Sequence, residues 1–199
     1  EEQDAFALGS QQKAIKAKEQ GKFEKELIPV AIKSKQGSTL FTEDENIKNT
    51  NLEKLLTLKP AFKENGTVTA GNASSLNDGA AAVIVASELA VREYNLKPLA
   101  KIRSVASAAV APSIMGIGPV PATQKALTRA NLTIQDIELA ELNEAFAAQV
   151  LAVNKELGLR EEIINVNGGA IALGHPIGCS GARIVVSLVH ELRRQKKQI

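Results

Sequence analysis

The stretch from Asn165 to Arg183 contains the residues best suited to chemistry, and it centres on His175. It reads NVNGGAIALGHPIGCSGAR, which is a short apolar segment followed by a glycine-dense loop and a helical pattern. Glycines at this density allow the backbone to approach a ligand or another part of the chain closely. Imidazole is the side chain best matched to proton transfer near neutral pH. Because Gly174 and Pro176 hold His175 on a rigid turn, we interpret His175 as a catalytic residue.

The glycine spacing of this loop excludes two common nucleotide-binding motifs. No Lys followed by Ser or Thr completes a P-loop, and Gly174, Gly178 and Gly181 form GxxxGxxG instead of GxGxxG. Cys179 lies close enough to His175 in sequence to be considered as a nucleophile. A small buried cysteine is the commoner case, and we favour that interpretation.

A second candidate for chemistry is Asn143, within the sequence ELNEAFAAQ that begins at Glu141. It lies where a predicted strand, 137–142, ends and a predicted helix, 143–157, begins. An amide at this position can orient a water or a carbonyl at the edge of a parallel sheet, where ligands of α/β proteins bind. The alternative is that Asn143 caps the helix, which contributes about 1 kcal/mol.

The elements that position these residues alternate between strands and helices. Such alternation indicates βαβ units and a layered α/β fold with a largely parallel sheet. The apolar run 80–86 fits either a helical turn or a buried strand. We expect strands at 27–32, 100–110, 137–142 and 163–166, and helices at 4–21, 87–95, 119–131, 143–157 and 180–196.

The polar stretch 33–53 is too long for a simple connection in a compact domain, so we expect a surface loop or a functional excursion there. A boundary near Pro98 divides the chain into two regions, 1–97 and 98–199. The basic run 193–197 is explained by the preference of helix C-termini for positive charge, with a phosphate site as the alternative. His190, inside the last predicted helix, is interpreted as structural.

The composition excludes several classes of function. With 24 Lys+Arg and 22 Asp+Glu among 199 residues, the net charge of +2 provides no basic field for nucleic acid. One Cys and two His are too few for a structural zinc site, and a single Cys cannot form an intramolecular disulfide. No apolar run of membrane-spanning length occurs. We therefore expect a cytoplasmic protein with no membrane or nucleic-acid partner.

Several blocks along the chain, in order and near the expected spacing, together resemble the thiolase family. This family comprises the acetyl-CoA acetyltransferases and the 3-ketoacyl-CoA thiolases. The resemblance extends along nearly the whole chain. It rests on QDAFA at 3–7 with Ser10-Gln11, the small-residue stretch 66–82, MGIGP at 115–119, NEAF at 143–146 and GHPIG at 174–178.

The resemblance implies a thiolase-like layered α/β fold with two similar halves. Residues 1–97 would form the end of the N-terminal half with its loop excursion, and 98–199 most of the C-terminal half. It also implies condensation of two acetyl-CoA molecules to acetoacetyl-CoA and CoA, or the reverse thiolysis, through an acyl-Cys intermediate. The CoA thioester is the substrate, and no further cofactor is implied. The complete protein would be a homodimer or tetramer.

Site residues follow from the same resemblance. His175 matches the histidine that activates the nucleophilic Cys and donates to the thioester oxygen, and Asn143 matches the asparagine that holds a water there. Lys48 stands near a family arginine that packs on the CoA adenine, but it lacks a flat stacking face. Ser74 matches a contact to the pantetheine arm, and the positions lining the CoA and acyl pocket are Phe62, Ala70, Met115 and Phe146.

One departure from the family pattern concerns the nucleophile. Neither of the two catalytic Cys blocks of the family occurs in this chain, and Cys179 matches neither. We therefore expect part of a thiolase that is inactive alone. The alternatives are a non-catalytic fragment that binds CoA or lipid, and a condensing enzyme like the ketoacyl synthases. Those enzymes pair two His with the Cys, whereas this chain pairs His175 with Asn143.

Overall fold

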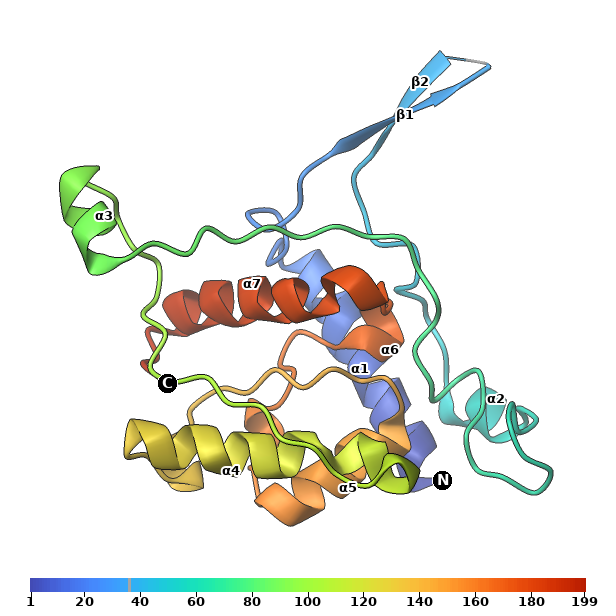
Figure 1. The fold of residues 1–199 in the computed structure, drawn as a ribbon. Helices are drawn as coiled ribbons and strands as arrows, with labels where there is room; N and C mark the ends of the chain where they lie inside the picture. Colours follow the sequence, from blue (N-terminus) through green and yellow to red (C-terminus); the bar gives the residue numbers. More distant parts are fainter. Residues whose placement is uncertain (36) are drawn as a thin grey trace.

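The computed structural model describes residues 1–35 and 37–199, and its architecture is dominated by helices (Figure 1). Its one ladder of consecutive paired residues among those described is an antiparallel hairpin, in which Val30 pairs with Phe41 and Ser34 with Gly37. The elements are α1 Glu2–Glu19, β1 Val30–Ser34, β2 Gly37–Phe41, α2 Leu52–Leu56, α3 Glu88–Glu93, η1 Pro112–Ile117, α4 Pro119–Ala130, η2 Ile134–Asp136, α5 Ala147–Leu157, η3 Glu161–Ile163, α6 Ala170–Leu173 and α7 Ile177–Gln195.

Helix α1 packs against α5 and α6, which come from the other end of the sequence. Its first turn carries Glu2 and Asp4 and its last turn carries Lys16 and Lys18, as the helix dipole favours. The buried face consists mainly of small residues, including Ala7, Ala14 and Ala17. A Cβ atom at Gly168 would lie 2.7 Å from the Ala14 Cβ, so this face allows the glycine loop to pack directly on the helix.

The main apolar core lies around α4, α5 and η3. Leu157 is followed by Gly158, whose left-handed backbone (φ +69°) ends α5 and returns the chain toward the core. The buried members of this core are Val120, Val153, Leu157, Leu159, Ile163 and Ile164.

Most predicted helices are confirmed, with shifts at their ends. Helix α1 ends before Gly21, and the Ala90 amide donates to the predicted cap Ser87 at 3.2 Å. Helix α7 begins at Ile177, three residues earlier than expected. Helix α5 begins at Ala147 with Phe146 as its N-cap residue, so the interpretation of Asn143 as a helix cap is wrong.

Of the four predicted strands, one is formed and three are not. The strand expected at 27–32 corresponds to β1, shifted to Val30–Ser34 and antiparallel. Those expected at 100–110, 137–142 and 163–166 are not formed as strands, and the run 80–86 is neither helical turn nor buried strand. Among residues 1–35 and 37–199, parallel pairing is limited to a single bridge between Ala140 and Ile164.

The reason is that a strand requires a neighbour to pair with. The segment from 100 to 110 is extended and largely exposed, and no described strand lies beside it to accept its hydrogen bonds. Its apolar side chains stay in solvent, with Ile102 63% and Val105 69% exposed. Figure 1 shows this segment running between α3 and η1 without a partner strand.

Two further features bear on function. No helix of the described chain is long and apolar enough to cross a membrane. The same residues contain no group of three or more His, Cys, Asp or Glu side chains placed to hold a metal ion.

Val153 tests the α4–α5 core. We expect Val153→Ala to lower the free energy of unfolding by about 1–3 kcal/mol, because Val153 is fully buried and the lost methyl groups leave a cavity. The measurement is denaturant unfolding followed by circular dichroism. Val185→Ala, on the half-exposed face of α7, is the matched control and should change stability by less than about 0.5 kcal/mol.

Candidate active site

The turn that carries His175 is held by a segment far away in the sequence. The His175 amide donates to the Ser75 carbonyl at 3.2 Å and to Asn77 Oδ1 at 3.1 Å. Gly174 has a left-handed backbone (φ +97°), and a Cβ atom there would overlap the Asn77 amide. The glycine before the histidine is therefore required both for the conformation and for the close approach.

The structure brings Asn143 and His175 together. The amide nitrogen Nδ2 of Asn143 lies 3.3 Å from Nε2 of the His175 ring. The Leu142 amide donates to Asn165 Oδ1 at 2.8 Å, and Asn165 Nδ2 donates back to the Leu142 carbonyl at 2.8 Å. This paired contact fixes the backbone immediately before Asn143. The Asn143 Oδ1 atom is buried and accepts no hydrogen bond from the described residues.

The residue after Asn143 is the buried carboxylate Glu144. Glu144 is 1% exposed, and its oxygens accept from Ser10 Oγ at 2.7 Å, Asn165 Nδ2 at 2.8 Å and the Ile171 amide at 3.1 Å. A Cβ atom at Gly169 would overlap the carboxylate, which explains the glycine there. Burial raises the pKa of Glu144 above its usual range, and these hydrogen bonds oppose that rise.

The other ring nitrogen of His175 faces a hydroxyl. Ser180 Oγ lies 2.7 Å from His175 Nδ1, and the same hydroxyl donates to the Pro176 carbonyl at 3.0 Å. Ser180 is buried in the first turn of α7. The imidazole is therefore in contact with a polar group at each nitrogen, which fixes its orientation.

Ser74 lies beside the segment that follows Asn143. Both its amide, at 3.0 Å, and its hydroxyl, at 3.1 Å, donate to the Ala145 carbonyl. Ala73 pairs with Phe146 in an antiparallel bridge, so the stretch around Ser74 runs along the asparagine loop. The structure thus places Ser74 near the predicted catalytic pair.

The remaining predicted contacts are more peripheral. Phe62 and Phe146 meet edge to face, with ring centroids 5.8 Å apart. Met115 is 77% exposed, Ala70 is exposed, and the Lys48 amide donates to Gln11 Oε1 at 2.9 Å while its side chain lies in solvent. Among the hydrogen bonds, ion pairs and ring contacts of residues 1–35 and 37–199, none joins these side chains to His175 or Asn143.

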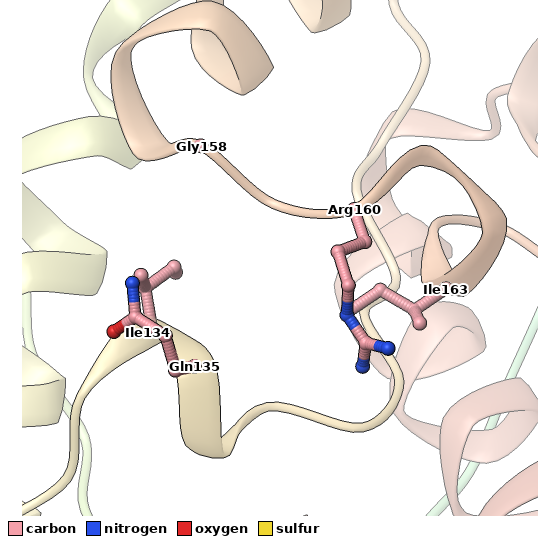
Figure 2. Close-up of a pocket in the computed structure, with 5 residues that line it drawn as sticks. All are labelled: Ile134, Gln135, Gly158, Arg160 and Ile163. Atoms are coloured by element: carbon pink, nitrogen blue, oxygen red, sulfur yellow. The ribbon is translucent and has the colours of Figure 1, made fainter.

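Two other features are not part of this site. Cys179 is buried, and a Cβ atom at Gly79 would lie 3.3 Å from its sulfur. A cavity of about 270 Å³ lies at the end of α5, and no predicted site residue lines it. Figure 2 shows its lining side chains. Its lining residues are Ile134, Gln135, Gly158, Arg160 and Ile163.

Sequence reasoning missed the supporting residues Glu144, Ser180 and Asn165. All are buried polar side chains, which must find hydrogen-bond partners inside the protein. Their positions within or next to the sequence blocks that contain Asn143 and His175 were the available signal. Which partners they would find depends on contacts across long sequence separations, so spacing alone could not identify them.

An ion pair lies near the asparagine segment. Arg183 Nη1 is 3.6 Å from Glu141 Oε2, and the Glu141 side chain is only 5% exposed. Burial raises the pKa of Glu141 from 4.5 to about 8, and the positive charge of Arg183 opposes that rise without overcoming it. Below about pH 8 the folded protein therefore favours the protonated acid, and the contact with Arg183 becomes an ion pair above that pH.

This shift makes stability depend on pH. Between about pH 5 and pH 8 the unfolded chain releases a proton that the folded chain retains, so stability falls as pH rises, by up to about 1.4 kcal/mol per unit. We expect Glu141→Gln to reduce this slope, measured by denaturant unfolding at several pH values. Glu162→Gln, at an exposed ion pair, is the control. A slope that stays unchanged in Glu141→Gln would contradict the assignment.

Comparisons with known proteins agree with this geometry. The sequence model of the thiolase C-terminal domain matches residues 96–199, and that of the thiolase N-terminal domain matches residues 1–89. A probable acetyl-CoA acyltransferase of Staphylococcus aureus is 56% identical over 96% of this chain and 49% of its own length. An acetyl-CoA acetyltransferase of Syntrophomonas wolfei is 54% identical over 98% of this chain and 50% of its own.

Solved structures give the same result. The Bacillus anthracis acetyl-CoA acetyltransferase superposes with a TM-score of 0.96 at 51% identity, over 98% of this chain and 50% of that one. The human mitochondrial 3-ketoacyl-CoA thiolase in complex with CoA superposes with a TM-score of 0.94 at 51% identity, over 98% and 49%. The chain spans about half the length of these relatives. Its fold is an incomplete thiolase-like α/β arrangement, and the chain belongs to the thiolase family.

Proposed function

We propose that the protein containing this chain is a thiolase-type acyltransferase, which condenses two acetyl-CoA molecules to acetoacetyl-CoA and CoA or catalyses the reverse thiolysis. The observation that supports this most directly is the 3.3 Å contact between Asn143 Nδ2 and His175 Nε2. The names of the relatives, acetyl-CoA acyltransferase and acetyl-CoA acetyltransferase, support the same reaction class.

The contact between Asn143 and His175 places two polar groups where they can stabilise the negative charge of the reaction. Attack on a thioester places negative charge on its oxygen, and preorganised hydrogen-bond donors there contribute on the order of 100- to 1000-fold each. His175 Nε2 accepts the proton of the attacking thiol and then donates the resulting N–H to that oxygen. The Asn143 amide, next to the same nitrogen, holds a water or the oxygen itself.

The proposal assigns the nucleophile to a cysteine outside these 199 residues. Cys179 is the single cysteine of the chain. It is buried, and the backbone at Gly79 lies close to its sulfur. A nucleophilic thiol must be reached by the substrate, which the burial of Cys179 does not favour.

The substrate-binding part of the proposal uses the surface around the catalytic pair. Ser74 contacts the pantetheine arm, Lys48 lies toward the adenine, and the apolar groups line the acyl and CoA pocket. The edge-to-face rings of Phe62 and Phe146 offer exposed apolar surface close to the asparagine segment. These apolar groups are Phe62, Ala70, Met115 and Phe146. The CoA bound to one structural neighbour supports CoA as the ligand class.

Further parts of the proposal concern the complete protein. It acts on CoA thioesters with no additional cofactor, resides in the cytoplasm and assembles as a homodimer or tetramer. Residues 1–97 and 98–199 belong to its two similar halves.

The decisive experiment measures thiolysis of acetoacetyl-CoA by the complete product of the gene. We expect His175→Ala to lower kcat by about 100- to 10,000-fold and Asn143→Ala by about 100- to 1000-fold. His190→Ala, which removes the other histidine of the chain, is the matched control and should keep the wild-type rate. Full activity in both site variants would refute the assignment. CoA binding without turnover in the complete product would favour a non-catalytic CoA-binding protein.

The 199-residue chain alone provides a complementary test. We expect no thiolysis and no acetyl group on Cys179 after incubation with acetyl-CoA, because that thiol is buried. Intact-mass spectrometry detects a single added acetyl group. Rapid acetylation of Cys179 would show that the nucleophile has been misassigned.

A further inference from the structure

The hydrogen bonds around His175 define which ring nitrogen carries the proton. We propose that Ser180 is a positioning residue that holds neutral His175 as the Nδ1–H tautomer, so that Nε2 is the nitrogen free to accept a proton. The inference deepens the proposed function, on which its catalytic consequence rests. It starts from two contacts of one hydroxyl, 2.7 Å to His175 Nδ1 and 3.0 Å to the Pro176 carbonyl.

Counting hydrogens at Ser180 gives the tautomer. A serine hydroxyl has one hydrogen, and the Pro176 carbonyl can only accept. The hydroxyl therefore donates to Pro176, and toward the ring nitrogen it can act only as an acceptor. His175 Nδ1 must then carry the hydrogen that joins them. Because neutral imidazole has one N–H group, Nε2 keeps a free lone pair.

The opposite side of the ring agrees independently. Asn143 presents its amide nitrogen Nδ2, which is a donor only, to His175 Nε2 at 3.3 Å. This contact is favourable when Nε2 accepts, and it would be repulsive if Nε2 carried a hydrogen. The contacts of Asn143 and Ser180, which come from different segments, therefore both fit the Nδ1–H tautomer.

The contact between Ser180 and the His175 ring is held in place by the first turn of α7. The Ser180 side chain is buried, and its own amide also donates to the Pro176 carbonyl at 2.9 Å, in the first turn of α7. The Cys179 amide donates to the same carbonyl at 2.8 Å. Since the carbonyl and the hydroxyl are both held by the start of the helix, the acceptor facing Nδ1 has little freedom to move.

This arrangement suits a ring that gains and loses a proton. When Nε2 accepts a proton, Nδ1–H keeps its bond to Ser180, and the Asn143 amide is the group that must give up its contact with the ring. No carboxylate hydrogen-bonds the ring within residues 1–35 and 37–199. The partner is therefore a neutral hydroxyl, which orients the imidazole without adding a negative charge beside it.

The first test reads the tautomer directly in the 199-residue chain by ¹⁵N NMR of the histidine rings. A His190→Gln background leaves His175 as the single histidine. We expect Nδ1 to carry the proton in this background. Adding Ser180→Ala should raise the Nε2–H population about fivefold to tenfold, the weight of one lost hydrogen bond. Ser180→Thr, which keeps the hydroxyl, should restore the original ratio.

Ser187→Ala is the matched control, because Ser187 is a second buried serine of α7 that bonds Glu26 and not the ring. It should leave the ratio unchanged. A ring protonated mainly at Nε2 in the parent background would overturn the proposal even if Ser180→Ala does not fold. An unchanged ratio in a folded Ser180→Ala chain would overturn it as well.

A second test addresses the catalytic consequence in the complete gene product. We expect Ser180→Ala to lower kcat for thiolysis about fivefold to tenfold with little change in KM, and Ser180→Thr to recover it. A kcat that stays unchanged in Ser180→Ala, with or without a change in KM, would refute the catalytic consequence. If the wild-type product shows no thiolysis, the proposed function fails, and the NMR result still decides whether Ser180 sets the tautomer.

Discussion

The arrangement of this molecule depends on one buried carboxylate, Glu144. It accepts hydrogen bonds from a side chain of α1, from the Asn165 amide and from the Ile171 backbone. These donors are brought together from opposite ends of the sequence. Leaving any of them unsatisfied in the interior would cost about 1–3 kcal/mol. Asn143 precedes Glu144, and the turn that carries His175 follows Ile171, so one carboxylate holds both segments in place.

Small residues make this convergence possible. Alanine provides three of the six buried residues of α1, and the glycine loop packs on this face at Gly168. Gly169 leaves room for the Glu144 carboxylate, and Gly174 for the Asn77 amide. In a fold with so few aromatic residues, segments pack tightly because their backbones approach closely. At each of these glycines, a particular neighbouring group leaves no room for a side chain.

The parts of the fold predictable from sequence were those determined locally. The cap at Ser87, the long amphipathic helix at the C-terminus and the turn at His175 follow from nearby residues. The sheet was not predictable in the same way, since residues 100–110 have the composition of a strand but no described partner to pair with. Within the site, His175 and Asn143 were found by residue type and motif. Glu144 and Ser180 act through contacts that only the three-dimensional arrangement reveals.

The extended segment that joins α3 to η1 has a consequence for handling this polypeptide. Its β-branched residues Ile102 and Val105 lie in solvent, and its backbone pairs with no described strand, although the Val105 carbonyl accepts a hydrogen bond from Arg129 of α4. Sequences of this kind template intermolecular β-pairing and are held in check in globular proteins by neighbouring strands or by charge. An extended segment of this composition favours association of the 199-residue chain at high concentration, and its charged residues Lys101 and Arg103 oppose that association.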